Sequence, residues 1–393
     1  MRIAYISYPA FADCDFPLIR ALREQGNEVM YFLILSPFHC HSTLVDISCL
    51  KATYDIIPGD SYPELEQYNS YLNASSINIV NFGGNSKWGR LRLWYKFHHA
   101  LRMARPDAIQ LTHFFPPYAI FYYLTFRNKL FITIHDPVHH TGEYSRRDVL
   151  LRKIGTSAMR GFVFLSRNDT LINAFKERYH IPQRKIHYAA LAPYDVLSAI
   201  PRDQTKHPSD FLFIGRISQY KGIDTLLEAM TLLSDTRPKA KLIVAGAGDF
   251  WFDISNYKNN PCIEIIHRFI TPGELVAFIQ DTRYVICPYT DGTQSGVIMS
   301  ALAFGRPVIA SNVGNFSSII KNGVNGILVP PSNPTALAEA MESALDPSKD
   351  SIIQESMSGT DFSQEWDMIA RMYIDAYRSS YHDHPKANSL PAK

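Results

Sequence analysis

The sequence predicts an α/β protein with two doubly wound, Rossmann-like domains that face each other across a cleft. Short apolar runs alternate with longer helical patterns along the chain, which is typical of parallel sheets covered by helices on both faces. A polar segment that contains prolines, AIPRDQTKHPSD at 199–210, interrupts this alternation, and the alternation restarts after it. The length of 393 residues also suits two domains better than one.

The first half of the chain predicts an N-terminal domain over residues 1–198. Its apolar runs predict strands at 2–7, 28–35, 77–82, 107–112, 129–135 and 161–166. Amphipathic patterns between them predict helices at 15–26, 88–105, 117–127 and 168–179. The first strand begins almost at the N-terminus, without the charged segment and long apolar core of a signal peptide.

The second half predicts a C-terminal domain over residues 199–361. Strands are expected at 211–215, 241–246, 263–266, 284–288, 307–310 and 326–330, with a helix at 220–233. The aromatic tail 362–382 predicts a further helix, and residues 383–393 are expected to be disordered. Because ligands of open α/β sheets bind at the carboxyl ends of the strands, we expect the site in the cleft between the domains.

The composition argues against several classes of protein. Lysine and arginine number 39 and aspartate and glutamate 37, and this near balance gives no support to a nucleic-acid partner. Five cysteines without a Cys-x-x-Cys spacing indicate free thiols in a reducing compartment. No apolar run reaches the roughly 18 residues of a membrane span, so we expect a cytoplasmic protein, with attachment to the inner face of a membrane left open.

The segment FIGRISQYKG at 213–222 predicts a clamp for a diphosphate. Gly215 ends a strand and allows a ligand to approach the backbone closely. Arg216 offers a planar fork for phosphate oxygens and Lys221 a point charge, and both flank one loop. The alternative is a pair of solvated surface cations.

The segment DGTQSGVIMSALAFGRPVIASNVG at 291–314 predicts a second anion site in the same domain. Its residues Thr293, Gln294, Ser295 and Gly296 come just before a helix that ends at Gly305. A helix N-terminus exposes backbone N–H groups and the positive end of the helix dipole. Ser295 also suits an N-cap, and the two roles are compatible.

Together these motifs resemble family 4 glycosyltransferases, which have the GT-B fold. The clamp resembles their G-R-x4-K-G element, and residues 303–341 resemble the family's usual continuation. In the N-terminal half the resemblance rests on the order of elements and on TIHDP at 133–137. It implies retaining transfer of a sugar from a UDP- or GDP-sugar without a metal ion. It also implies that the donor lies on the C-terminal domain and the acceptor on the N-terminal one. In relatives the tail crosses back to the N-terminal domain, so that linker and tail form a hinge.

The resemblance also implies roles for individual residues. Arg216 and Lys221 neutralise the leaving diphosphate, and His135 touches the donor sugar near the reacting centre. Further donor-binding positions are Gly215, Gly246, Gly248, Phe269, Ile270, Asp291, Thr293, Gln294, Ser295, Gly296, Val297 and Ser300.

The sequence departs from the family at two places. The family's two glutamates, spaced E-x7-E, correspond to Gly292 and Ser300, which puts recognition of the ribose in doubt. Asp291, one residue away, is a candidate replacement. The glycine pair that often follows the first strand is absent from SYPAFADCDF at 7–16, so acceptor specificity does not carry over.

The segment HDPVHHTGE at 135–143 gathers histidines and acids. A metal site is one interpretation, although the spacing fits no standard zinc pattern. The other, which we adopt, is that Asp136 faces the cleft beside His135 and that the following loop, with His140 and Glu143, borders the acceptor.

Residues 86–105 form a basic, aromatic stretch without an acidic residue, in which apolar residues recur at helical spacing: Trp88, Leu91, Trp94, Tyr95, His98 and Leu101. This suits a helix on an anionic membrane surface. The other interpretation, which we favour, is an ordinary helix that covers a sheet.

The sequence thus predicts a retaining hexosyltransferase that acts on a glycan or lipid-linked acceptor in cell-surface polysaccharide or glycolipid synthesis. One alternative is a non-catalytic nucleotide-sugar-binding subunit that regulates a transferase, which the missing glutamates favour. Another is a nucleotide-sugar epimerase of the GT-B fold. Transfer or hydrolysis of a labelled donor by the isolated protein would exclude the non-catalytic subunit.

Overall fold

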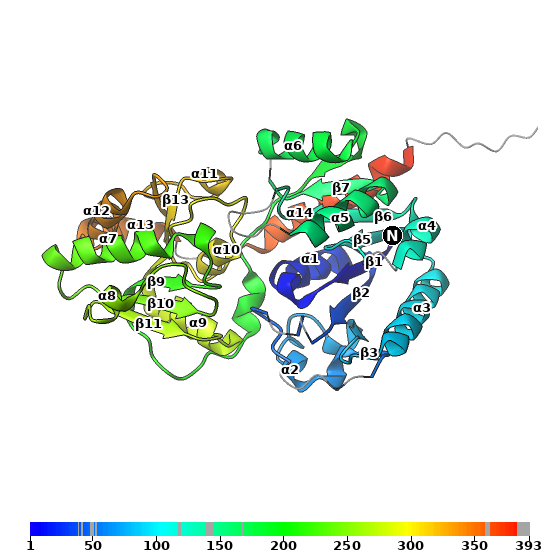
Figure 1. The fold of residues 1–393 in the computed structure, drawn as a ribbon, viewed down its shortest axis with the longest axis horizontal. Helices are drawn as coiled ribbons and strands as arrows, with labels where there is room; N and C mark the ends of the chain where they lie inside the picture. The colour runs from blue at the N-terminus through cyan, green and yellow to red at the C-terminus, as the bar shows by residue number, and fades with distance from the viewer. Residues whose placement is uncertain are drawn as a thin grey trace, which may run out of the picture.

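Two α/β domains lie side by side in the computed structural model, each built on its own sheet (Figure 1). The structure describes residues 1–37, 39–40, 42–47, 51, 53–116, 119–138, 145–166, 168–357 and 362–382. The predicted class, two doubly wound Rossmann-like domains, is confirmed. The predicted disorder of 383–393 falls outside the described residues.

The N-terminal sheet has eight strands in the order β3-β4-β2-β1-β5-β6-β7-β8. They are β1 (Arg2–Ser7), β2 (Glu28–Leu35), β3 (Ile56–Pro58), β4 (Ile77–Asn81), β5 (Ala108–Leu111), β6 (Leu130–Ile134), β7 (Gly161–Phe164) and β8 (Ile186–Tyr188). All six predicted strands are present. The sequence analysis missed β3 and β8, because three residues are too few to show a period. Strand β3 pairs antiparallel with β4. A fully parallel sheet was expected, and β3 is the exception.

Alternate residues of β1 show how this sheet separates two cores. Ile3 and Tyr5 belong to one buried cluster and Ala4 and Ile6 to another, because successive side chains of a strand point to opposite faces. The helices are α1 (Ala12–Glu24), α2 (Pro63–Glu66), α3 (Lys87–Ala104), α4 (Ile120–Phe126), α5 (Arg146–Gly155) and α6 (Asp169–Tyr179). Helix α1 packs on the first face, and α3, α4 and α6 pack on the second.

The tail helix α14 (Ser363–His382) packs on the N-terminal domain, against α1. The hydroxyl groups of Tyr373 and Thr133 lie 2.9 Å apart, and the hydroxyl of Tyr377 donates to Oε1 of Gln110 over 3.0 Å. These bonds are buried, which fixes the register of the helix on β5 and β6. The chain therefore runs from the C-terminal sheet back to the N-terminal sheet.

The C-terminal sheet has six strands, all parallel, in the order β11-β10-β9-β12-β13-β14. They are β9 (Ser209–Ile214), β10 (Leu242–Gly246), β11 (Ile263–His267), β12 (Thr282–Cys287), β13 (Val308–Ser311) and β14 (Gly326–Val329). The helices are α7 (Ile223–Thr236), α8 (Ser255–Lys258), α9 (Pro272–Asp281), α10 (Gly296–Ala303), α11 (Phe316–Ile319), α12 (Pro334–Ala344) and α13 (Pro347–Met357). Every strand predicted here is present within two residues of its expected ends.

Two further expectations concern cysteines and membrane spans. Cys14, Cys40, Cys262 and Cys287 are buried free thiols, and Cys49 lies outside the described residues. None of the helices in the described ranges combines the length and the apolar character that crossing a membrane requires.

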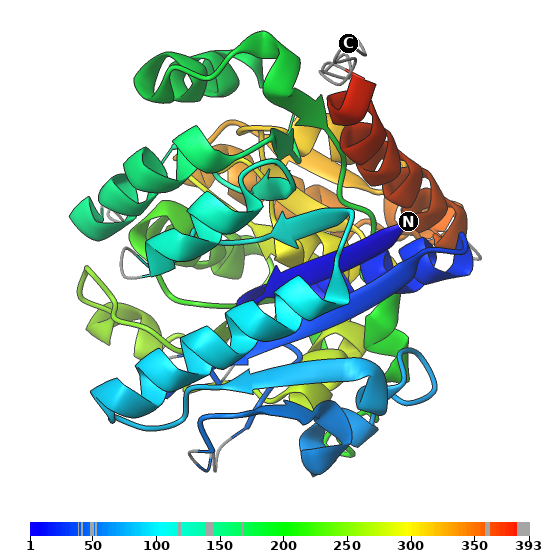
Figure 2. The same ribbon diagram turned by 90° about the vertical axis from the view of Figure 1, so that its right-hand side faces the viewer.

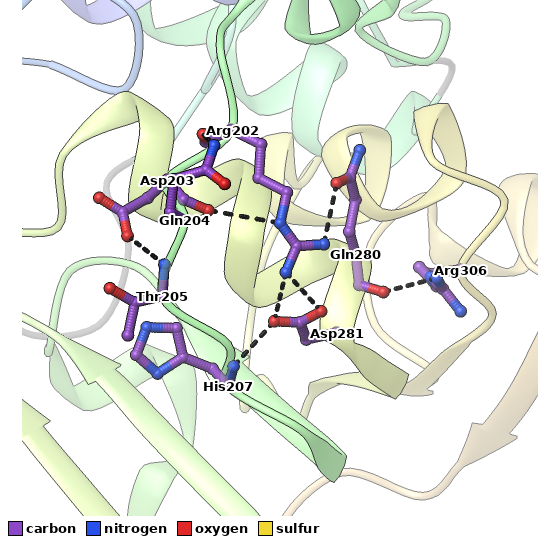
Figure 3. A network of polar contacts seen from close by, with 8 residues as sticks. All are labelled: Arg202, Asp203, Gln204, Thr205, His207, Gln280, Asp281 and Arg306. Atoms are coloured by element: carbon purple, nitrogen blue, oxygen red, sulfur yellow. Dashed lines mark hydrogen bonds and ion pairs between the residues drawn. The ribbon is translucent and has the colours of Figure 1, made fainter.

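The linker between the domains is fixed to the C-terminal domain by the last residue of α9 (Figure 3). Nη2 of Arg202 donates to both carboxylate oxygens of Asp281 over 2.7 and 2.8 Å. The backbone N–H of His207 donates to the same carboxylate over 2.8 Å, and the His207 ring stacks on Phe278. Residues 202–207 are thus part of the C-terminal domain, and a hinge in the linker would lie before Arg202.

We expect Asp281→Ala to lower the melting temperature, because it leaves a half-buried guanidinium and a backbone N–H without their acceptor. The loss in unfolding free energy should be about 1–3 kcal/mol. The matched control is Glu264→Ala, which breaks the exposed Lys241–Glu264 ion pair and should cost less than about 1 kcal/mol. Equal losses in calorimetry would contradict this role of Asp281.

Candidate functional site

The loop after β9 begins at Gly215, whose φ of +129° favours glycine. A Cβ atom at this position would lie 3.3 Å from Nζ of Lys221 and 3.5 Å from Cγ2 of Val297. The loop closes through a 3₁₀ turn, η8 (Gln219–Lys221), and Gly222 then starts α7 with a φ of +64°. The two predicted anion sites therefore lie next to each other, on either side of the space that glycine at position 215 leaves open.

Lys221 is buried, and its ammonium group connects the clamp to α10. Its Nζ donates to the hydroxyl of Tyr289 over 3.1 Å and lies 4.9 Å from the centre of that ring. The Tyr289 hydroxyl lies 3.1 Å from Oγ of Ser295. Ser295 caps α10, because its Oγ accepts from the N–H of Ile298 over 3.3 Å. The solvated-cation interpretation is thus wrong for Lys221, while Arg216 is exposed.

A second turn, from β10, lies against the clamp. A Cβ atom on Gly246 would come within 1.9 Å of the carbonyl oxygen of Gly215. One on Gly248, whose φ is +131°, would come within 2.3 Å of the carbonyl oxygen of Ile217. His267, at the end of β11, bonds the carbonyl of Gly248 through Nε2, and Phe269 and Ile270 follow it. The predicted base-binding segment thus lies on the same edge of the sheet.

The loop before α10 contacts the N-terminal domain through Thr293 and Gln294. The hydroxyl of Thr293 donates to the carbonyl of His135 over 3.2 Å and also to the carboxylate of Asp136. The side-chain amide of Gln294 donates to the carbonyl of Leu165. Both residues were predicted to bind the donor, and the structure places the polar groups of their side chains between the domains. Their bonds bring His135 next to the loop that leads into α10.

His135 follows β6, and its ring stacks on Phe11 with centroids 4.2 Å apart. Its Nε2 is buried and has no hydrogen-bond partner among the described residues. Burial lowers the pKa of the imidazole to about 4, against the opposing effect of Asp136. The ring is therefore neutral near pH 7, and its ring nitrogens provide a donor or an acceptor of a hydrogen bond without a charge.

Asp13 faces the N-terminus of α10 from the other domain, and the sequence analysis did not single it out. Its Oδ2 lies 3.6 Å from the position that a Cβ atom on Gly296, the first residue of α10, would occupy. Desolvation raises the pKa of this carboxyl to about 7. The sequence feature that could have pointed to Asp13 is an acidic residue within 7–16, where relatives carry a glycine pair.

Three other predicted residues have different surroundings. Ser300 is buried, and its Oγ donates to the carbonyl of Gly296 over 2.9 Å, so this hydroxyl is left only as an acceptor for a ligand. Asp291 is half-buried in the middle of the loop between β12 and α10. The Asp136 backbone carbonyl accepts from Nη1 of Arg152 over 2.8 Å, which holds this turn on α5.

A cavity of about 100 Å³ adjoins the turn after β6 within the N-terminal domain. It is lined in part by Phe11, His113, His135, Asp136 and Arg152. His140 and Glu143, which were expected on the acceptor side, lie outside the described residues. Within the described part of the chain, no group of three or more His, Cys, Asp or Glu residues could hold a metal ion.

Residues 208–347 match the model of the family described as Glycosyl transferases group 1. An uncharacterized glycosyltransferase of Methanocaldococcus jannaschii is 30% identical over 176 residues, which cover 42% of this chain and 44% of that protein. The first curated relatives that the chain matches are each covered over less than half of their own length. The C-terminal domain is thus similar to group 1 glycosyltransferases over residues 208–347.

Two solved structures resemble the whole chain. The Anabaena protein HepE, in complex with UDP-glucose, aligns with a TM-score of 0.62 at 15% identity and covers 97% of this chain and 98% of its own. Sucrose-phosphate synthase of Thermosynechococcus elongatus aligns with a TM-score of 0.63 at 15% identity, over 98% of this chain and all of its own. At this level of identity the likeness shows the fold, which is GT-B.

Gly248→Ala should destabilise the C-terminal domain more than Gly323→Ala. Both glycines have positive φ, but a Cβ atom on Gly323 would meet nothing within 4 Å, whereas one on Gly248 meets a backbone oxygen. We expect Gly323→Ala to cost about 1 kcal/mol and Gly248→Ala at least about 2 kcal/mol more. Denaturant unfolding of both variants measures the difference, and equal losses would show that the turn relaxes freely.

Proposed function

We propose that this protein is a retaining glycosyltransferase that moves a hexose-type sugar from a nucleoside diphosphate sugar to a glycan or lipid-linked acceptor. The observation that carries the proposal is the convergence of three elements on one point. The clamp loop, the buried ammonium of Lys221 and the capped N-terminus of α10 surround the space beside Gly215. This is the combination of cation, close backbone and helix dipole that a diphosphate requires.

The donor would bind on the C-terminal domain and the acceptor on the N-terminal one. The turns at Gly246 and Gly248 and the segment at Phe269 and Ile270 lie beside the clamp, where the nucleoside would extend. The solved complex of HepE with UDP-glucose supports a UDP-sugar as the first donor to test. A glycan or lipid-linked acceptor in cell-surface polysaccharide or glycolipid synthesis follows from the family resemblance alone.

In the transfer step, the bond between the anomeric carbon and the oxygen of the β-phosphate breaks, and the acceptor oxygen bonds to that carbon on the same face. The departing diphosphate gains negative charge, which Lys221 and Arg216 would stabilise. The acceptor hydroxyl loses its proton, which the leaving phosphate oxygen would take up. The neutral ring of His135 would donate to or accept from a sugar hydroxyl without a competing charge. The step needs no metal ion.

The rival function is a nucleotide-sugar-binding subunit without catalytic activity. The replacement of the two family glutamates by Gly292 and Ser300 favours it, as does the engaged hydroxyl of Ser300. A GT-B epimerase would share the donor site but would return a changed nucleotide sugar without an acceptor. Incubation with radiolabelled UDP-glucose distinguishes the transferase, the non-catalytic subunit and the epimerase. Only the transferase produces labelled glycan or lipid, or slowly releases free sugar.

Lys221→Ala should lower donor turnover by more than about tenfold, which corresponds to about 1.4 kcal/mol of lost transition-state stabilisation. The control is Lys258→Ala, an exposed lysine on α8 of the same domain, which should leave turnover unchanged. Hydrolysis or transfer of UDP-glucose under single-turnover conditions is the measurement. A smaller loss in a folded variant would show that Lys221 is not part of the clamp.

The affinity for UDP-glucose should fall as the pH rises from 6 to 8, because Asp13 titrates at about 7 in the folded protein. Its carboxyl is neutral at the lower pH and negative at the higher one, whereas the diphosphate of UDP-glucose keeps its charge throughout this range. Repulsion at the N-terminus of α10 should weaken binding at least about threefold. Calorimetric titrations of the wild type and Asp13→Asn measure this, and the variant should bind equally at both values. A wild-type affinity independent of pH would contradict the placement of Asp13.

A further inference from the structure

Helix α3 carries two apolar rows, only one of which covers the sheet. The inner row, Leu93, Trp94, Phe97 and Leu101, is buried in the N-terminal core. The outer row consists of Trp88, Leu91, Tyr95 and Met103, which are exposed by 81%, 50%, 70% and 70%. The inner row thus covers the sheet as an ordinary helix does, whereas the outer row stays exposed. The apolar residues that the sequence showed together therefore divide between two faces of one helix.

The outer row continues onto the neighbouring helix α4. His98 on α3 contacts the ring of Phe121, and its Nε2 lies 3.0 Å from the hydroxyl of Thr125. On the outside of α4, Ile120 and Leu124 are exposed by 51% and 71%. Of the twelve large apolar side chains exposed in the described residues, six thus lie on these two helices. We call them the α3–α4 surface: Trp88, Leu91, Tyr95, Met103, Ile120 and Leu124. Such clustering distinguishes a docking surface from scattered exposed residues.

The charge on this surface has one sign. Neither α3 nor α4 contains an acidic residue. Exposed basic residues flank the apolar row, namely Lys87, Arg92, Lys96, Arg102, Arg105 and Arg127. The nearby acid Asp55 is paired with Lys96. The surface is therefore apolar along its centre and positive at its edges.

We propose that the α3–α4 surface binds an anionic lipid bilayer. Tryptophan, tyrosine, leucine and isoleucine side chains would enter the boundary between head groups and acyl chains, while lysine and arginine side chains reach the head-group phosphates. A second copy of the chain is a poor occupant, because a symmetric contact would bring basic rims against each other. The chemistry thus favours a flat, anionic and partly apolar partner.

The surface lies apart from the site between the domains. Helices α3 and α4 lie on the side of the N-terminal domain away from the C-terminal domain (Figure 1). Figure 2 shows α3 across the face that would meet the bilayer. None of the six apolar residues contributes to the clamp or to the cavity beside His135, so the surface and the donor site can be tested separately.

The test is co-sedimentation of the full chain with two kinds of vesicle at low salt. One kind contains phosphatidylcholine and phosphatidylglycerol, and the other phosphatidylcholine alone. The test variants are Trp88→Ser with Leu124→Ser, and Arg92→Glu with Arg102→Glu. The matched control is Leu232→Ser with Ile352→Ser, which removes apolar side chains exposed by 47% and 62% on the C-terminal domain. UDP-glucose binding by thermal shift verifies that each variant keeps its donor site.

We expect the wild type and the control to bind the anionic vesicles, and each test variant to partition at least about tenfold less. Energy transfer from tryptophan to a dansyl lipid should accompany binding, because Trp88 lies on the proposed surface. Absence of binding to anionic vesicles, or equal binding by the control and both test variants, would overturn the proposal. So would a dimer, detected by light scattering, that the same substitutions dissociate. Loss of vesicle binding with intact UDP-glucose binding leaves the proposed donor site unaffected.

Discussion

The arrangement of the site depends on the close approach of two backbones, at Gly215 and Gly246. A Cβ atom on Gly246 would lie within 1.9 Å of the Gly215 carbonyl oxygen, whereas one on Gly215 would meet Nζ of Lys221 at 3.3 Å. This contact brings the loop after β9 against the turn after β10. It also leaves the space beside Gly215 into which Nζ of Lys221 and the side chain of Val297 project. A side chain at Gly215 would compete with Nζ of Lys221 for this space and would narrow the proposed anion site.

The contacts between the domains depend in turn on the loop that this arrangement positions. Thr293 and Gln294 precede α10 and donate to the N-terminal domain at His135, Asp136 and Leu165. The backbone N–H of Tyr194 also donates to the carbonyl of Met299 in α10 over 3.3 Å. In this structure the two domains are thus in contact at the loop before α10. A donor that binds beside α10 would rest against residues that also hold the domains together, which couples binding to closure.

Sequence reasoning was most accurate where a local pattern determines the structure. The twelve longer strands follow from apolar runs, and Gly215 and Lys221 follow from the spacing of one loop. Contacts that depend on a distant partner could not be predicted. Thr293 and Gln294 have the composition of an anion-binding loop, and nothing in the local sequence reveals that they donate across to the other domain. Asp13 is a comparable case, because its importance arises only from the facing N-terminus of α10. In the sequence, the apolar residues of α3 form one pattern. Only the position of the sheet shows which of them are buried and which are exposed.

This chain also differs from the family that it resembles in the distribution of acidic residues around the candidate site. Two glutamates expected on the C-terminal side are replaced by Gly292 and Ser300, and the hydroxyl of Ser300 donates within its own helix. An acid is present instead on the opposite wall, at Asp13, where desolvation favours its neutral form. A carboxylate on the C-terminal side would contact the nucleoside, whereas one at the N-terminus of α10 competes with the phosphates for the same partial positive charge. The protonation state of Asp13 would therefore regulate occupancy of the anion site, a role that a ribose-binding glutamate does not have.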